Sequence, residues 1–271
     1  MINSRKKKIG IFDSGLGGLT VFKSLAKSYR ENSTFLYLGD LAHLPYGDKS
    51  KKSIIRYSQK IVDFFINNKV DIIIVACNSA SSVALHALQA NVPIIGTIEP
   101  SIQQVINTKS NGSIGIIGTE TTINSKAYNQ AFEQYKNYTI YSVACPLFVP
   151  IVEEGWENTE IAYQVAIKYL NQFSSMNLDT IVLACTHYPM LIDTLKPAFH
   201  ALGHTNLNFI DSGYAISNYL FSELCFQKDT NSNNIIHPDD QFYVTDTSHQ
   251  FNELANRFLG SAIPNIELIT L

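Results

Sequence analysis

The segment Asp71-Ile-Ile-Ile-Val-Ala-Cys77-Asn78-Ser79 is an apolar run of strand length that ends in a thiol and two small polar residues. The same order recurs far downstream in Asp179-Thr-Ile-Val-Leu-Ala-Cys185-Thr186-His187. Each run predicts a buried strand that carries a cysteine at its carboxyl end. Two thiols presented in the same way indicate one reaction centre.

Strands and helices alternate on either side of the first run. Apolar strands are expected at 9–12, 35–38 and 93–97 as well as at 71–77, with amphipathic helices between them. The expected helices include 79–89, 122–135 and 248–259, and a loop is expected over 145–155. Because each strand is almost wholly apolar, the pattern predicts an α/β fold in which a mostly parallel sheet is flanked by helices on both faces.

The pattern then restarts, which predicts a duplicated α/β half. Ile114-Gly-Ile-Ile-Gly118 echoes Ile9-Gly-Ile-Phe12 at a displacement of 105 positions, and Cys185 follows Cys77 by 108 positions. We therefore expect two like α/β halves. The second repeat is complete near residue 210, so the tail is expected to return to the first sheet. The predicted domains are 1–99 plus 211–271, which makes the first domain discontinuous, and 100–210.

The composition bounds the class of protein. The chain has 271 residues, of which 45% are hydrophobic and 16% charged, and it is long enough for one large domain or two ordinary ones. No apolar run approaches the roughly 18 to 20 residues of a membrane helix. The basic start lacks the apolar core of a signal peptide, and four cysteines without a dense framework are typical of reduced thiols. A soluble cytoplasmic protein is expected.

A net charge of −3 argues against nucleic acid as a partner, since phosphate binding needs a basic face. The glycine-rich turn Asp13-Ser-Gly-Leu-Gly-Gly18 opens a helix after the first strand. It departs from a dinucleotide fingerprint because Thr20 stands where the third glycine belongs, and no P-loop lysine follows. Such a turn is suited to a small anion such as a carboxylate.

Ligands of parallel sheets bind at the carboxyl ends of the strands, where Asp13, Cys77, Thr119 and Cys185 all fall. If the two halves face each other, the thiols approach one cleft from opposite sides. That arrangement serves a two-base reaction at a carbon acid, in which one thiolate removes a proton and the other thiol donates one to the opposite face. The ordinary pKa of cysteine, about 8.5, makes both forms accessible. His187 and Asp13 are the candidate tuning groups.

Cysteines at strand ends can also have other roles, and the sequence leaves three of them open. A lone buried cysteine is commonly inert, and Cys145 and Cys225, which lack polar followers, are interpreted in that way. Zinc could be held by the paired cysteines with His187, although no C-x-x-C motif occurs. A thiol hydrolase would explain Cys185 and leave Cys77 without a role. Glu153 is either a general acid or an exposed loop charge.

At these positions the chain resembles the bacterial glutamate racemases, cofactor-independent enzymes of the aspartate/glutamate racemase superfamily. The matching segments together span nearly the whole chain: Phe12-Asp-Ser-Gly-Leu-Gly-Gly18, Pro45-Tyr-Gly47, Ala76-Cys-Asn-Ser-Ala-Ser81, Ile98-Glu-Pro100, Gly118-Thr119, Cys145-Pro with Val149-Pro and Glu153, Ala184-Cys-Thr-His-Tyr-Pro189, and Asp211-Ser-Gly213. The resemblance implies two pseudo-symmetric α/β domains, each a mostly parallel sheet flanked by helices, with the active site in the cleft between them. It also implies racemisation of L-glutamate to D-glutamate without cofactor or metal, to supply peptidoglycan synthesis and so cell wall biogenesis and cell shape. Racemisation of aspartate or another acidic amino acid is the nearest alternative.

The resemblance also implies roles for individual residues. Cys77 and Cys185 would exchange the proton, Cys77 acting on the D form and Cys185 on the L form. Asp13, Glu153 and His187 would assist them. Substrate contacts would come from Asp13, Ser14, Tyr46, Gly47, Asn78, Ser79, Thr119, Thr122, Thr186 and His187. A homodimer and activation by a cell-wall precursor are left open.

Three residues depart from the family pattern. Ser79 stands where Thr is usual, Ala184 where Gly is commoner, and His43 where Arg is frequent. Ser79 keeps the hydroxyl, so substrate binding is expected to persist. Ala184 adds a methyl beside a catalytic strand end, and His43 removes a permanent positive charge near the mouth of the site.

Overall fold

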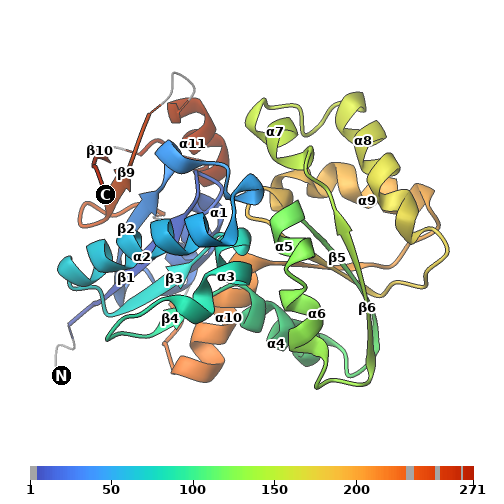
Figure 1. Ribbon diagram of the computed structural model, residues 1–271, viewed down its shortest axis with the longest axis horizontal. Helices are drawn as coiled ribbons and strands as arrows, with labels where there is room; N and C mark the ends of the chain where they lie inside the picture. Colours follow the sequence, from blue (N-terminus) through green and yellow to red (C-terminus); the bar gives the residue numbers. More distant parts are fainter. Residues whose placement is uncertain (1–4, 230–234, 248–250, 264) are drawn as a thin grey trace.

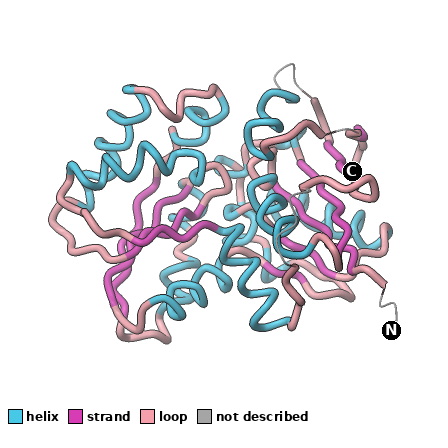
Figure 2. The backbone as a smooth tube through the Cα atoms, turned by 180° about the vertical axis from the view of Figure 1, so that it is seen from behind, coloured by secondary structure: helices cyan, strands magenta, loops and turns pink. Residues whose placement is uncertain are grey.

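The computed structural model describes residues 5–229, 235–247, 251–263 and 265–271. They form an α/β fold with two parallel sheets, each in its own half of the molecule, and Figure 1 shows the halves side by side. Figure 2 shows the strands inside each half with helices around them. No helix of the described residues is long and apolar enough to cross a membrane.

The two sheets share one strand order. The first runs β10-β9-β2-β1-β3-β4 and the second β6-β5-β7-β8, so β2-β1-β3-β4 corresponds to β6-β5-β7-β8. The register is also repeated: Ile9 pairs with Ile72, and their equivalents at the two sequence offsets, Ile114 and Thr180, pair with each other. The predicted α/β class with two pseudo-symmetric halves is confirmed.

The strands of the first sheet are β1 (Lys7–Asp13), β2 (Ser33–Gly39), β3 (Ile72–Val75), β4 (Ile94–Ile95), β9 (Gln241–Val244) and β10 (Glu267–Leu268). Those of the second are β5 (Gly112–Gly118), β6 (Tyr138–Ala144), β7 (Thr180–Ala184) and β8 (Asn208–Asp211). The tail thus adds β9 beside β2, and β10 beside β9. The boundaries near residues 99 and 210 stay a proposal for the domain division.

The α-helices are α1 (Leu19–Tyr29), α2 (Lys51–Asn67), α3 (Asn78–Val83), α4 (Ile98–Thr108), α5 (Glu120–Asn124), α6 (Ala127–Phe132), α7 (Phe148–Glu153), α8 (Glu160–Leu170), α9 (Ile192–Ala201), α10 (Ser212–Leu224) and α11 (Phe251–Leu259). Short 3₁₀ helices are η1 (Leu41–His43), η2 (Tyr46–Asp48), η3 (Leu85–Ala87), η4 (Asn171–Phe173) and η5 (Tyr188–Leu191). Helices α1 and α4 both pack against α10, which lies at the junction of the halves in Figure 1.

Burial explains why the halves stay together. Helix α2 buries Ile54, Ile61, Val62 and Phe65, which fall on one face at helical spacing, against one side of the first sheet. A second apolar cluster is continuous across the molecule: it joins Ile11 of β1 and Leu25 of α1 to Ile181 of β7 and to α8, α9 and α11. The cleft is therefore bounded by halves that share part of their core.

Several helices differ from the sequence prediction. The helix expected at 79–89 ends at Val83 and continues as η3, and the one expected at 122–135 is divided into α5 and α6. The prediction of a loop over 145–155 was wrong, because α7 forms there and buries Phe148, Ile151 and Val152 at helical spacing. The expected start of the last helix, at residue 248, lies outside the described residues.

Candidate active site

The two predicted reactive cysteines line one cavity between the halves. Cys77 follows β3 and Cys185 follows β7, so each thiol lies at the carboxyl end of the equivalent strand of its sheet. The cavity has a volume of ≈ 390 Å³. It is lined by Ser14, Gly15, Leu44, Pro45, Tyr46, Gly47, Asp48, Cys77, Asn78, Ser79, Thr119, Glu120, Pro146, Leu147, Val149, Pro150, Glu153, Cys185, Thr186 and His187. Asp13 and Thr122 of the predicted set lie buried behind this surface.

Cys77 lies in an electrically negative, buried setting. Its Sγ is 3.6 Å from Ser14 Oγ and accepts a hydrogen bond from the Ala80 N–H at 3.5 Å, which caps α3. Burial, reinforced by the charge of Asp13, raises the pKa of Cys77 to about 12. In the free protein this side chain is therefore a neutral thiol.

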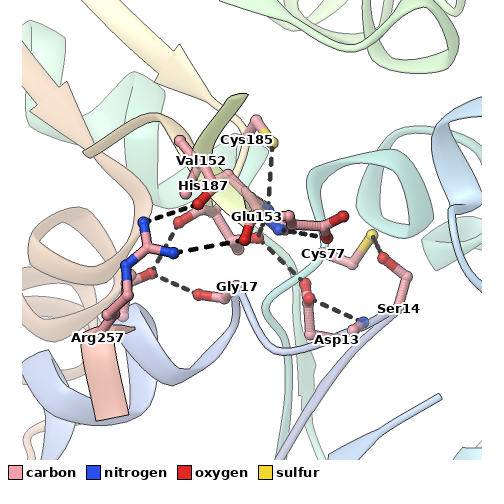
Figure 3. Close-up of polar contacts among 12 residues, drawn as sticks. Asp13, Ser14, Gly17, Cys77, Val152, Glu153, Cys185, His187 and Arg257 are labelled. Atoms are coloured by element: carbon pink, nitrogen blue, oxygen red, sulfur yellow. Dashed lines mark hydrogen bonds and ion pairs between the residues drawn. The ribbon is translucent and has the colours of Figure 1, made fainter. Parts of the chain in front are cut away.

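Cys185 lies beside a histidine instead. The Nδ1 of His187 is 3.9 Å from Cys185 Sγ, and its Nε2 is 3.1 Å from Glu153 Oε1 (Figure 3). Burial opposes protonation of this imidazole, but its hydrogen bonds to Cys185 and Glu153 outweigh burial and raise the pKa of His187 to about 10. The ring therefore presents a positive charge to the second thiol at neutral pH.

Asp13 connects the halves at the end of β1. Its Oδ2 accepts from the Gly15 N–H at 3.1 Å, and its Oδ1 accepts from the Thr186 hydroxyl at 3.4 Å. Burial raises the pKa of Asp13 in spite of the nearby His187. The backbone of the first half also approaches the second half at Gly17, where a Cβ would lie 2.5 Å from His187 Nδ1. Glycine is needed there for the two halves to approach.

Hydroxyl groups from both halves meet on the floor of the cavity. Ser79 Oγ lies 2.9 Å from Thr119 Oγ1, which caps α5 and donates to Thr122 Oγ1 at 3.1 Å. The departure at Ser79 thus keeps a hydroxyl in contact with the second half.

Asn78 lines the cavity, but its amide is committed to the protein. Its Nδ2 donates to Ser212 Oγ, and its Oδ1 accepts from the hydroxyls of Thr97 and Tyr128, each at 2.8 Å. Its hydrogen bonds therefore fix the position of Asn78 in the floor of the cavity.

A buried carboxylate that the sequence did not single out holds the opposite wall. Asp40, at the end of β2, accepts hydrogen bonds from the hydroxyls of Tyr46 and Thr245 and contacts His43 Nδ1 at 2.9 Å. Tyr46 is fully buried, and burial and Asp40 raise its pKa, so its hydroxyl is a donor. The Gly47 carbonyl accepts from Thr121 of the second half. His43 therefore supports the wall through Asp40.

The remaining wall comes from α7 and the residues before it, and it is apolar: Pro146, Leu147, Val149 and Pro150. The lining residues include no lysine or arginine among those that the structure describes. A bound carboxylate would have to be held by hydroxyls, backbone N–H groups and the protonated His187. Ala184, the other departure, does not line the cavity and is buried in the core of the second half.

The described residues contain no group of three His, Cys, Asp or Glu side chains placed to hold a metal ion. Cys145 is fully buried with its Sγ near the Val143 carbonyl, and Cys225 is exposed. Neither thiol lines the cavity, so only Cys77 and Cys185 are available to a ligand there.

The chain is thus an α/β protein of two like halves, with a thiol from each half lining the cavity between them. The chain belongs to the Asp/Glu/hydantoin racemase family, whose sequence model matches residues 9–219, and it is accordingly an isomerase. The glutamate racemase of Sulfurihydrogenibium sp. (strain YO3AOP1) is 41% identical over 93% of this chain and 94% of that protein.

Solved structures agree with this assignment. The glutamate racemase of Francisella tularensis in complex with D-glutamate superposes with a TM-score of 0.85 and 33% identity, covering 98% of both chains. The enzyme of Aquifex pyrophilus superposes with a TM-score of 0.77 and 40% identity over 96% of this chain and 98% of its own.

Proposed function

We propose that this protein interconverts L- and D-glutamate without a cofactor, with Cys77 and Cys185 as the two acid/base groups. The observation that carries the proposal is that both thiols line one cavity from equivalent strand ends of the two sheets. We infer glutamate as the substrate from the family and from the relatives that are named as glutamate racemases.

The reaction balances with these two groups alone. One cysteine, as thiolate, takes the proton from the α-carbon, and the electron pair of the C–H bond is left on the substrate as a carbanion. The opposite cysteine, as thiol, gives its proton to the other face of that carbon. The centre is inverted, no electron is exchanged with a cofactor, and the two cysteines end with their protonation states reversed.

The surroundings of the thiols favour one starting arrangement. Burial and Asp13 keep Cys77 protonated, while the cationic His187 lies beside Cys185. We therefore assign Cys185 as the group that removes the proton of the L form and Cys77 as the group that protonates the opposite face. Turnover of the D form requires the reverse arrangement.

The cavity suits a small polar substrate. Its volume lies near the lower end of the range of about 300 to 1,000 Å³ found for small-molecule sites. The glycine-rich turn with Ser14, the wall formed by Tyr46 and Gly47, and the hydroxyls of Ser79, Thr119 and Thr186 offer donors to two carboxylates. Aspartate, shorter by one methylene, would leave part of this space unfilled and lose about 1 to 3 kcal/mol.

Deuterium incorporation tests the proposal directly. Incubation with L- or D-glutamate in deuterated water, with chelator and no added cofactor, should give the opposite enantiomer carrying deuterium at the α-carbon. Cys77→Ala and Cys185→Ala should each abolish inversion, whereas Cys225→Ser, a change at an exposed thiol outside the cavity, should not. Near-normal inversion by either alanine variant would sink the two-base assignment, and preference for aspartate in a chiral assay would reassign the substrate.

The wider role follows from the product. D-glutamate supplied in the cytoplasm would serve peptidoglycan synthesis, and with it cell wall biogenesis and cell shape. Measuring wall precursors in cells depleted of the protein, with and without external D-glutamate, tests that role. Homodimer formation and activation by a cell-wall precursor stay predictions, to be read from sedimentation and from turnover with the precursor added.

A further inference from the structure

An arginine outside the cavity lies behind the Cys185 half of the site. Arg257, on α11, donates from Nη2 to the Val152 carbonyl at 2.8 Å and from Nη1 to the Glu153 carbonyl at 3.4 Å. The same Nη2 lies 2.7 Å from both carboxylate oxygens of Glu157. Helix α7 ends at Glu153, so Arg257 binds two carbonyls at its C-terminal end, where a cation is favoured by the helix dipole.

These contacts lead to the sulfur by a short chain. Glu153, whose carbonyl Arg257 holds, places its carboxylate on His187 Nε2, and His187 Nδ1 faces Cys185 (Figure 3). The neighbour of Arg257 on α11, Phe258, meets the His187 ring edge-on with 5.2 Å between centroids. Helix α11 therefore contacts His187 through Phe258, and it contacts the backbone of Glu153 through Arg257.

The carboxylate of Glu153 needs such support. Its side chain is 35% exposed, whereas that of His187 is 7% exposed. An exposed ion pair gains little by itself, because solvent screens it and an unrestrained side chain loses entropy on pairing. Fixing the backbone at the end of α7 restricts the movement of the Glu153 side chain and so keeps its carboxylate close to the imidazole. Glu157 is itself buried, and its carbonyl is held by Thr194, so the guanidinium has a fixed counter-ion.

The other thiol has no such connection to α11. Cys77 contacts Ser14 and the Ala80 N–H of α3, and its charged neighbour is Asp13, all from the first half. Helix α11 packs on α1, also of the first half, while its arginine reaches α7 of the second half. Among the described residues, the Cys185 side alone therefore depends on this contact between halves.

We propose that Arg257 is a positioning residue for Cys185: by holding the end of α7 and Glu157, it keeps Glu153 on His187 and the imidazole on the thiol. The inference rests on the proposed two-cysteine reaction. It adds a residue that touches neither substrate nor thiol, and it assigns the effect to one of the two proton transfers. The contact also makes the Cys185 half complete only when the two halves are closed against each other.

Isotope effects separate the two transfers. Deuterium on the α-carbon of L-glutamate reports transfer to Cys185, and deuterium on D-glutamate reports transfer to Cys77. Arg257→Met keeps the apolar stem and removes the donors, so it should lower kcat/KM about tenfold, the loss of roughly one charge-assisted hydrogen bond. The isotope effect on kcat/KM should rise for L-glutamate and fall for D-glutamate, because transfer at Cys185 becomes limiting.

The controls make the result specific. Arg257→Lys should restore most of the activity, and Arg5→Met, the same change at an ion pair that is 74% exposed on the arginine side, should change neither isotope effect. If Arg257→Met fails to fold in a thermal melt, Glu157→Gln, which weakens the hold on the guanidinium, takes its place. Isotope effects that stay unchanged, or that move together for both enantiomers, would overturn the proposal, as would full activity of Arg257→Met.

A second readout does not depend on turnover. With ¹⁵N-labelled histidine, the Nε2–H proton of His187 should be protected from exchange by Glu153 in the wild type and exchange faster in Arg257→Met. Wild-type protein that fails to racemise glutamate yet shows this difference would refute the proposed function and keep the positioning role. Equal exchange in both proteins would refute the positioning role alone.

Discussion

Replacing Gly17 with alanine tests whether the position of His187 matters to turnover. A Cβ built at Gly17 lies 2.5 Å from His187 Nδ1 and closer still to Thr186 Oγ1. Non-bonded contact needs about 3.5 Å, so the ring has to move by roughly 1 Å or the glycine-rich turn has to retreat by as much. The backbone of Gly17 is not in the left-handed region, which leaves the methyl as the cause of any effect.

The size of the effect follows from this displacement. Overpacking of a closed site costs about 1 to 3 kcal/mol of stability, and a 1 Å misplacement of a catalytic group costs about 10²-fold in rate. Gly17→Ala should therefore lower the free energy of unfolding, measured by urea denaturation, by about 1 to 3 kcal/mol, and kcat by about two orders of magnitude. Gly15→Ala, where a Cβ meets nothing within 4 Å, is the matched control for stability. A Gly17→Ala enzyme with kcat within about threefold of wild type would show that the imidazole is not used where the structure puts it.

Three further predictions concern the groups around the cavity. Asn78→Ala should lower the free energy of unfolding in urea by about 2 to 3 kcal/mol, because the buried hydroxyls of Thr97 and Tyr128 lose the amide oxygen that accepts their hydrogen bonds. A loss below about 0.5 kcal/mol, roughly the size of a surface change, would contradict this prediction. Tyr46→Phe removes a donor to Asp40 and should raise KM more than it lowers kcat; unchanged steady-state constants would exclude this support. His187 keeps its proton in the folded state to about pH 10, against 6.5 for an unperturbed histidine, so the free energy of unfolding should fall as pH rises between these values, by at most about 1.4 kcal/mol per unit. His187→Gln should flatten that slope, and an equally steep slope in the variant would refute the pKa.

The sequence predicted those features that follow from local pattern. Runs such as 71–77 are apolar throughout because both faces of a parallel sheet are covered, and that pattern needs no knowledge of the partner strands. The repeat offsets also agree with the register of the two sheets, since Ile9 and Ile114 pair with equivalent residues. Where local signals conflicted, prediction was less secure: the prolines at 146 and 150 favoured a loop over 145–155, although the buried residues of α7 already had helical spacing.

Features that depend on distant parts of the chain could not be predicted. Asp40 gains its role from Thr245, which is 205 positions away and reaches it only because β9 pairs with β2. Arg257 likewise reaches Glu157 only after the tail has folded back across the halves. Neither residue lies in a motif, and a single sequence carries no signal for a hydrogen bond between elements whose pairing is unknown. The positions of the thiols were accessible because their strands carry the signal themselves.

The repeat also shows how two like halves come to hold unlike thiols. At the offset of 108 positions, Ser79 corresponds to His187, and at the offset of 105, Asp13 corresponds to Gly118. The first half thus places a carboxylate behind its thiol, which with burial keeps Cys77 neutral, and the second half places a cationic ring beside Cys185. The enantiomers have equal free energies in water, so kcat/KM must stay equal in the two directions whatever these charges are. A change of charge at Asp13 or His187 therefore lowers kcat/KM by the same factor for both enantiomers, and the asymmetry of the site can show only in kcat and KM taken separately and in the isotope effects.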